Sequence, residues 1–151
     1  MGLSWLEARV YVHATEDRGK VLKALSTVVP FGSEGVEVDE DLFEGHYGNP
    51  ILVLTVRVRS PSLAERALKS LLSRLERHEL SFILETLDER VDKNGVLYLR
   101  VSKQDAFYGE PRILEGDDVI RLSIGFKGGR RRALEFFRGL VEGELRSREG
   151  Q

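Results

Sequence analysis

Apolar side chains recur at every second position in five stretches of this chain, a pattern typical of strands with one buried face. The stretches cover residues 5–13, 36–43, 51–59, 96–101 and 119–127. Between and after them, apolar residues return at intervals of three and four, which predicts helices after 15, from 61, near 80–91 and over 130–145. Two periods in one chain indicate a mixture of strands and helices.

The predicted order of elements is β-α-β-β-α-(α)-β-β-α, where the bracketed helix is either separate or a bent continuation of its predecessor. The first five elements match the opening of a split βαβ arrangement. Because each strand has one apolar face, we predict an α+β fold with a single sheet and helices packed on one face. The length of 151 residues and the lack of a linker indicate a single domain, 1–151.

Two helix starts have recognisable signals. Ser60 precedes Pro61, which is the pattern of an N-cap followed by proline at the first helical position. Thr15 is the expected N-cap of the first helix, with Glu16 and Asp17 in its first turn.

Composition narrows the class of protein. There is no cysteine, which excludes disulfides and thiolate chemistry, and scarce Met, Asn and Gln fit a heat-adapted, thermostable protein. No apolar run approaches the roughly 20 residues of a membrane span, and residues 1–6 do not resemble a signal peptide. We therefore expect a cytoplasmic protein without a membrane partner.

The charge is small overall but unevenly placed. A net charge of −2 argues against bulk electrostatic coating of nucleic acid. Residues 1–50 hold 4 basic against 9 acidic residues, whereas residues 51–151 hold 19 against 16. The chain therefore predicts an acidic hairpin and a basic C-terminal third.

The predicted outward face of the sheet places arginines beside aromatic rings, as RNA-binding sheets do. Its basic and aromatic members are Arg9, Tyr11, His13, Arg57, Arg59, Tyr98, Arg100, Arg121 and Lys127. Two alternatives remain open. Glu37, Asp39 and Asp41 could neutralise these arginines on a merely solvated face, or the face could be buried in a homodimer.

Two further segments have candidate anion contacts. Gly128 and Gly129 precede Arg130, Arg131 and Arg132 at a predicted helix start, where backbone N–H and guanidinium groups converge on a phosphate. The alternative is a local carboxylate partner, Asp117 or Asp118. In the segment 103–109, Lys103 and Gln104 are candidates to contact a phosphate and a 2′-hydroxyl; the alternative is a capped turn closed by its aromatic residues.

Enzymatic motifs are missing, so we predict no catalytic residue, cofactor or metal. The three histidines, His13, His46 and His78, occur singly. We interpret the pair Asp117-Asp118 as a turn before the last strand rather than as a cation site.

The loop between the second and third predicted strands contains more glycine, proline and hydrogen-bonding side chains than a hairpin turn needs. It reads Glu44, Gly45, His46, Tyr47, Gly48, Asn49 and Pro50. We predict a positive φ at Gly45 or Gly48, entry of Pro50 into the next strand, and a hydrogen bond between His46 and Glu44.

This loop, followed by Ile51, resembles the signature of a family of small archaeal proteins predicted to bind RNA and linked to the RNA-degrading exosome. The Thr15-Glu16-Asp17 segment, the 95–103 strand and the following Lys103-Gln104 pair add to the resemblance, although Asp105 and Phe107 depart from the family pattern. The resemblance implies a fold like RNA-binding ribosomal proteins and a non-catalytic role in RNA processing or degradation.

We therefore predict a non-catalytic RNA-binding protein of the archaeal cytoplasm that contacts the RNA backbone through arginines, with an RNA-processing complex as a further partner. The candidate contacts are Arg57, Arg59, Tyr98, Arg100, Lys103, Gln104, Lys127, Arg130, Arg131 and Arg132. The alternative is a homodimeric or small-anion-binding module without RNA; an adaptor acting through the acidic hairpin is a third hypothesis.

Overall fold

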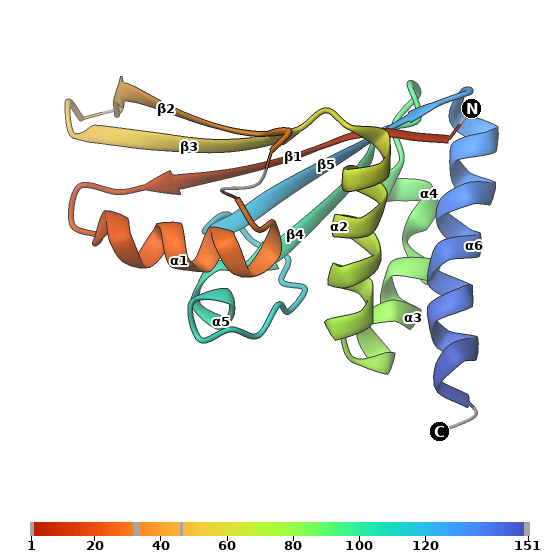
Figure 1. Ribbon diagram of the computed structural model, residues 1–151. Helices are drawn as coiled ribbons and strands as arrows, with labels where there is room; N and C mark the ends of the chain where they lie inside the picture. Colours follow the sequence, from red (N-terminus) through yellow and green to blue (C-terminus); the bar gives the residue numbers. More distant parts are fainter. Residues whose placement is uncertain (1, 32–33, 46, 150–151) are drawn as a thin grey trace.

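The computed structural model describes residues 2–31, 34–45 and 47–149, which form a five-stranded antiparallel sheet and helices on one side of it (Figure 1). The strands are β1 (Gly2–Val12), β2 (Val36–Glu44), β3 (Pro50–Val58), β4 (Leu97–Ser102) and β5 (Val119–Lys127). The helices are α1 (Arg18–Val28), α2 (Pro61–Arg74), α3 (Arg77–Glu85), α4 (Leu87–Arg90), α5 (Lys103–Phe107) and α6 (Arg130–Glu149).

The strand order is β2-β3-β1-β5-β4. Strand β3 is antiparallel to both β1 and β2, so those two strands run parallel with β3 inserted between them. This is the predicted split βαβ unit, with α1 as its crossover. The predicted α+β fold, a single sheet with helices on one face, is confirmed.

The core lies between the sheet and the helices, on what we call the inner face. Leu6, Ala8 and Val10 of β1 are 0–2% exposed, and α2 packs on β1 with Leu68 and Leu71 buried. Burying each such large aliphatic side chain contributes about 1.5–3 kcal/mol. The predicted register of β3 is also confirmed, since Leu54, Val56 and Val58 are buried.

The opposite, outer face is not covered by any helix among the described residues (Figure 1). No described helix is both long enough and apolar enough to cross a membrane.

Helix ends agree with the sequence at one predicted start and differ at the other. Ser60 caps α2 by accepting from the Leu63 amide. The prediction that Thr15 caps α1 is wrong: Asp17 is the cap, and its carboxylate accepts from the Gly19 amide at 2.8 Å. The reason is that residues 13–16 form a turn of their own, closed by a bond from Glu16 N to His13 O at 2.9 Å.

One edge of the sheet is covered by a neighbouring segment, and the other is free among the described residues. The segment after α5 covers β4, with bonds from Ser102 N to Arg112 O at 2.8 Å and from Leu114 N to Arg100 O at 3.1 Å. At the other edge, every residue of β2 after Val36 is exposed, and none of the described segments pairs with its free side.

The 44–50 loop has the predicted backbone. Gly48 has a φ of +80°, and Pro50 is the first residue of β3, paired with Glu44. The Gly45 amide donates to Asn49 O at 2.6 Å, and the Gly48 amide donates to Gly45 O at 2.9 Å. The predicted bond between His46 and Glu44 lies outside the described residues.

Trp5 lies against the outer face of β5. It is paired with Gly125, and a Cβ atom added at position 125 would overlap the Trp5 indole. Glycine is required here because the ring occupies the space of a side chain.

Gly125→Ala should therefore displace the Trp5 indole from the sheet and lower the free energy of unfolding by about 1–3 kcal/mol, the usual cost of overpacking. Because Trp5 is the only tryptophan, its emission should shift to the red in the folded variant. Gly116→Ala is the matched control, since nothing lies within 4 Å of a Cβ there. Unchanged emission and stability would show that the indole does not rest on Gly125.

Gly48→Ala should lower the free energy of unfolding by about 1 kcal/mol, because alanine disfavours a positive φ. Gly48→Asn should cost less, since asparagine tolerates the left-handed region better. Urea denaturation of the two variants measures the difference. Equal losses for both would mean that packing, and not backbone conformation, selects glycine at this position.

Candidate nucleic-acid interface

Three arginines stand side by side across the outer face. Arg9 of β1 pairs with Arg121 of β5, which pairs in turn with Arg100 of β4. Adjacent strands are about 4.8 Å apart, so the three side chains form a continuous arginine row. Like charges directly opposite each other destabilise a sheet, which makes this arrangement costly unless an anion offsets it.

Local partners neutralise the arginine row only in part. Arg9 lies 3.4 Å from Glu7, and Arg121 lies 3.9 Å from the fully exposed Asp117. Arg100 donates to the backbone carbonyl of Gly116 at 3.2 Å. Exposed ion pairs of this kind are weak, so these arginines can exchange their carboxylate partners for a stronger anionic ligand.

Aromatic rings flank the arginine row. The Arg121 guanidinium lies 5.7 Å from the Tyr11 ring, and Tyr98 is 46% exposed. The Tyr98 hydroxyl donates to Asp92 at 2.9 Å; burial and this carboxylate both raise the pKa of Tyr98. With Trp5 on the same face, the rings form a surface suited to stacked bases.

A groove of about 420 Å³ adjoins the arginine row on its β3 side. Arg9, Tyr11 and His13 form one wall, and Phe43 and Val53 lie opposite. The groove combines two charged side chains, Arg9 and Asp41, with an apolar lining, which is the usual character of a small-ligand or base pocket.

Towards β2, the outer face becomes acidic. Arg57 forms ion pairs with Asp39 and Glu7, and Arg59 lies 3.5 Å from Glu37. Neutralisation by hairpin carboxylates, one of the two open alternatives, therefore holds for Arg57 and Arg59. It does not extend to Arg100 or Arg121 among the described ion pairs.

The basic segment at the start of α6 lies at one end of the sheet. Arg130 donates to the carbonyls of Asp88 at 2.9 Å and Val91 at 3.3 Å, so it binds the C-terminal end of α4. The suggestion that Asp117 or Asp118 compensates these arginines is wrong, because both residues lie beside the opposite end of β5. A cation at the carbonyl end of a neighbouring helix is favourable, which explains Arg130.

The other members of this segment are exposed. Arg131 lies 3.6 Å from Glu135, and Arg132 is on the surface. Lys127 is on the outer face, because it is three alternations along β5 from Arg121.

Lys103 lies at the other end of the sheet and is 7% exposed. Its ammonium donates to Asp118 at 2.6 Å, to Glu16 at 3.1 and 3.2 Å, and to the Tyr11 carbonyl at 2.9 Å. These acceptors occupy its donors, so the structure gives Lys103 a positioning role. Eight residue steps along β5 separate this end from Lys127, or about 27 Å; the predicted contacts therefore do not form one cluster.

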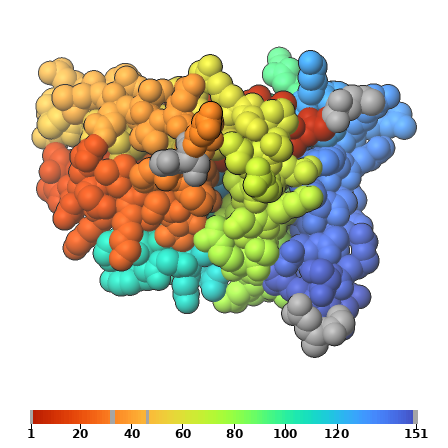
Figure 2. Space-filling view, viewed as in Figure 1, coloured from red at the N-terminus to blue at the C-terminus, as the bar shows by residue number. Residues whose placement is uncertain are grey.

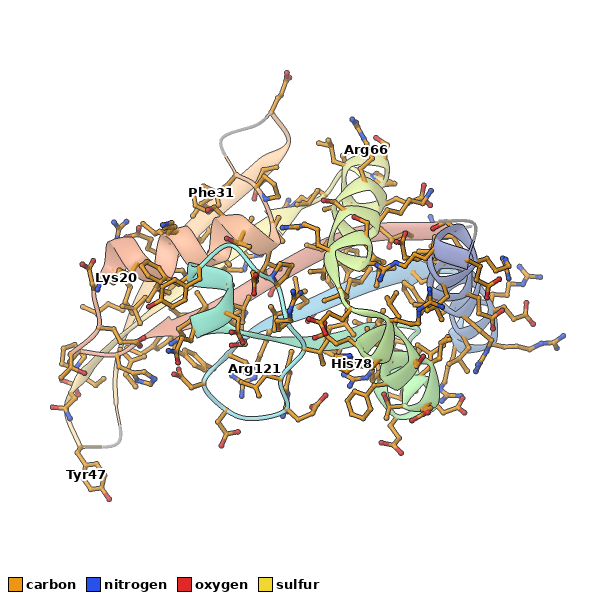
Figure 3. All side chains as sticks on the ribbon, turned by 90° about the horizontal axis from the view of Figure 1, so that it is seen from below. Lys20, Phe31, Tyr47, Arg66, His78 and Arg121 are labelled. Atoms are coloured by element: carbon orange, nitrogen blue, oxygen red, sulfur yellow. The ribbon has the colours of Figure 1, made fainter. Side chains whose placement is uncertain are left out.

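A cleft of about 460 Å³ opens beside Lys103. It brings together Thr15 and Asp17 with Gln104 and Tyr108, so two segments of the family resemblance meet at one place. Figure 3 shows Lys20, which also lines the cleft, near the same end of the molecule as Tyr47 at the hairpin tip.

The aromatic residues of the cleft lie at the C-terminal end of α5. The Lys23 ammonium lies 4.8 Å from the centre of the Phe107 ring, and Tyr108 is 72% exposed. Ser102 caps α5 by accepting from the Asp105 amide at 3.1 Å, which is the capped turn weighed as the alternative for this segment.

His13, Glu16 and Asp118 place ligand atoms within 4.8 Å of one another. Sequence spacing did not bring these three residues together, because Asp118 is remote in the chain. The Lys103 ammonium already binds both carboxylates, and its charge would repel a divalent ion. The positive charge that balances these two carboxylates is therefore the Lys103 ammonium.

Asp118→Asn should flatten the loss of stability in acid. The Lys103 hydrogen bond lowers the pKa of Asp118, against an opposing effect of burial, and the charges of Lys103 and His13 lower it further. The folded pKa is below the unfolded value of about 3.9, so the carboxylate stabilises the fold above that pH and the effect is lost as pH falls through the folded pKa.

Urea denaturation as a function of pH measures this effect. Asp41→Asn is the control, because Asp41 is exposed and has no cationic partner among the described residues. If the stability of Asp118→Asn falls with decreasing pH as steeply as that of the wild type, the Lys103 contact does not control the loss of stability in acid.

Two comparisons with known sequences identify the family of this chain. A family model described as RNA binding matches residues 5–126. The RNA-binding protein PAB1135 of Pyrococcus abyssi is 36% identical over 124 residues, which are 81% of this chain and 80% of that protein.

Solved structures show the same fold. Protein AF2318 from Archaeglobus fulgidus, of the family DUF54, is 35% identical with a TM-score of 0.79, over 91% of this chain and 99% of that one. Mth689 from Methanothermobacter thermautotrophicus, a DUF54 protein, is 28% identical with a TM-score of 0.77, over 93% and 99%. The chain therefore belongs to the RNA-binding family that this model describes, the family also designated DUF54.

Proposed function

We propose that this protein is a non-catalytic RNA-binding protein that holds the RNA backbone on the basic half of its outer face. The observation that carries the proposal is the arginine row, three guanidinium groups aligned across β1, β5 and β4 on a face that no helix covers among the described residues. Phosphate oxygens offset the repulsion between these charges and accept their hydrogen bonds. The name of the relative from Pyrococcus abyssi supports RNA as the ligand.

The proposed RNA path follows β5. Arg121 and Arg100 hold phosphates at one end, Tyr98 and Trp5 offer rings for stacking along the way, and Lys127 lies at the far end. Arg131 and Arg132 extend the basic surface beyond Lys127, and Gln104, in the cleft beside Lys103, offers a neutral amide beyond the end of β4. Such contacts read backbone and shape rather than base sequence.

Three predicted contacts take lesser parts in this proposal. Arg57 and Arg59 already face carboxylates, so they border the RNA surface rather than dominate it. The buried Lys103 ammonium binds Glu16 and the Tyr11 carbonyl. It thereby positions the end of β1 that bears Tyr11.

The wider role included in the proposal is RNA processing or degradation in the archaeal cytoplasm, in association with the exosome. This role rests on the resemblance of the 44–50 loop and not on a contact in the fold. A homodimeric or anion-binding module without RNA is not favoured by the family to which the chain belongs.

The triple variant Arg9→Gln/Arg100→Gln/Arg121→Gln tests the arginine row. Binding to single-stranded and structured RNA should weaken, and the slope of log K against log salt should fall by about two, since each phosphate contact of a single strand releases about 0.7 of a counterion. Fluorescence anisotropy at several salt concentrations measures both quantities.

The matched control is Arg66→Gln/Lys69→Gln/Arg146→Gln, which removes the same charge from the helix layer on α2 and α6. It should leave the salt slope nearly unchanged. If both triple variants weaken binding equally, overall charge and not the arginine row holds the RNA. If the parent protein shows no salt-dependent RNA binding, the proposed function is wrong.

A second triple variant, Lys127→Gln/Arg131→Gln/Arg132→Gln, measures the extension at the α6 start and should lower the slope by less than the arginine-row variant. Arg130 is left intact because it binds the end of α4. A loss larger than that of the arginine-row variant would move the centre of the interface to α6.

A further inference from the structure

The outer edge of β2 leaves backbone hydrogen-bonding groups available to an added strand. The outermost residues of an edge strand direct alternate N–H and C=O groups away from the sheet, where another strand can pair with them. The 110–116 segment blocks this at β4, but none of the described residues blocks it at β2. Figure 2 shows β2 and β3, in orange and yellow, along the upper margin of the molecule.

Exposed apolar side chains lie on both faces of this edge. Leu42 is 71% exposed and Val38 is 40% exposed on the inner face, beyond the cover of α1, and Phe43 is 57% exposed on the outer face. An edge strand with apolar side chains on alternating faces offers side-chain contacts as well as backbone hydrogen bonds.

The same strand is strongly acidic. We call its five carboxylates the acidic edge: Glu37, Asp39, Glu40, Asp41 and Glu44. Arginines of β3, α1 and the segment before α2 pair with the first three. Asp41 and Glu44, next to Leu42 and Phe43, have no cationic partner in the ranges that the structure describes.

Charge selects the occupant of this edge. If two copies of the chain paired through β2, two acidic edges would face each other, and like charges across a strand pair are destabilising. A strand bearing lysine or arginine would instead meet Asp41 and Glu44 as ion-pair partners. RNA is repelled by the acidic edge as well.

We propose that β2 is a docking edge for a basic extended segment of a partner protein, which adds to the sheet as a sixth strand. The backbone of β2 supplies hydrogen bonds, Leu42 and Phe43 supply apolar contact, and Asp41 and Glu44 select cationic side chains. This surface is separated from the arginine row by β3, so the protein can hold RNA and a partner strand together.

A synthetic peptide in which lysine and arginine alternate with valine tests the proposal on the full chain. It should bind with an affinity that falls as salt rises, and hydrogen exchange of the β2 amides should slow in the complex. The double variant Asp41→Lys/Glu44→Lys should weaken binding by about tenfold or more, because it turns two attractions into repulsions. Glu85→Lys/Glu89→Lys, on exposed helix positions, makes the same charge change and should leave binding unchanged.

Two control peptides separate strand addition from simple charge attraction. A copy with alternate backbone amides N-methylated keeps every charge but cannot pair, and a copy with glutamate in place of the basic residues keeps the pairing but not the charge. Neither should bind. Equal binding by the N-methylated peptide, or unchanged exchange of β2 amides, would overturn the proposal.

A second copy of the chain is the competing occupant. If sedimentation shows a dimer that strengthens with salt and is lost in Leu42→Lys, the edge pairs with itself and the basic partner is wrong. The arginine-row variant should still bind the peptide. Loss of RNA binding alone therefore bears on the proposed function, and loss of peptide binding alone bears on the docking edge.

Discussion

The central strand β1 pairs on both sides, with β3 and β5, and buries one face completely beneath the helices. Its other face bears Glu7, Arg9 and Tyr11. Covering that face would bury charged groups, which costs several kcal/mol unless each finds a partner. The period-two pattern that builds the core thus also keeps the outer face open. The proposed RNA surface depends on this one constraint.

Charge is sorted across the open face by strand. Cations concentrate on β1, β5 and β4, carboxylates concentrate on β2, and Arg57 and Arg59 form ion pairs where the two regions meet. A small net charge thereby coexists with a strongly polar surface. An RNA backbone is attracted to one half of the face and repelled by the other, which orients it along β5. The acidic half is available to a positively charged ligand.

Lys103 organises the end of the sheet at which β1 terminates. One buried ammonium joins the Tyr11 carbonyl, Glu16 and Asp118, which come from three separate segments. Because these acceptors belong to the end of β1, the turn before α1 and the residue before β5, this contact fixes the turn before α1 against β5. The turn and α5 form the cleft together, which gives a physical reason for the presence of both segments in the family resemblance.

Periodicity in the sequence was sufficient for the strands, their buried faces and the start of α2, because these depend on neighbours a few residues away. The positive φ in the 44–50 loop followed in the same way from its two glycines. Sequence reasoning also placed Arg9, Arg100 and Arg121 on one face. It could not align them, since alignment requires the order and register of β1, β5 and β4, which are set by pairings between distant segments.

Tertiary structure also decided which basic residues remain at the surface. Lys103 and Arg130 read as candidate phosphate contacts in the sequence, yet one binds carboxylates 87 and 15 positions away and the other binds the end of α4. Nothing in the local sequence distinguishes them from Arg131 or Lys127, because a charge is attracted to whichever acceptor the fold brings near it. Composition and period therefore determined the sheet, its sidedness and the kind of surface, whereas long-range packing determined which cations satisfy the fold and which are left for a ligand.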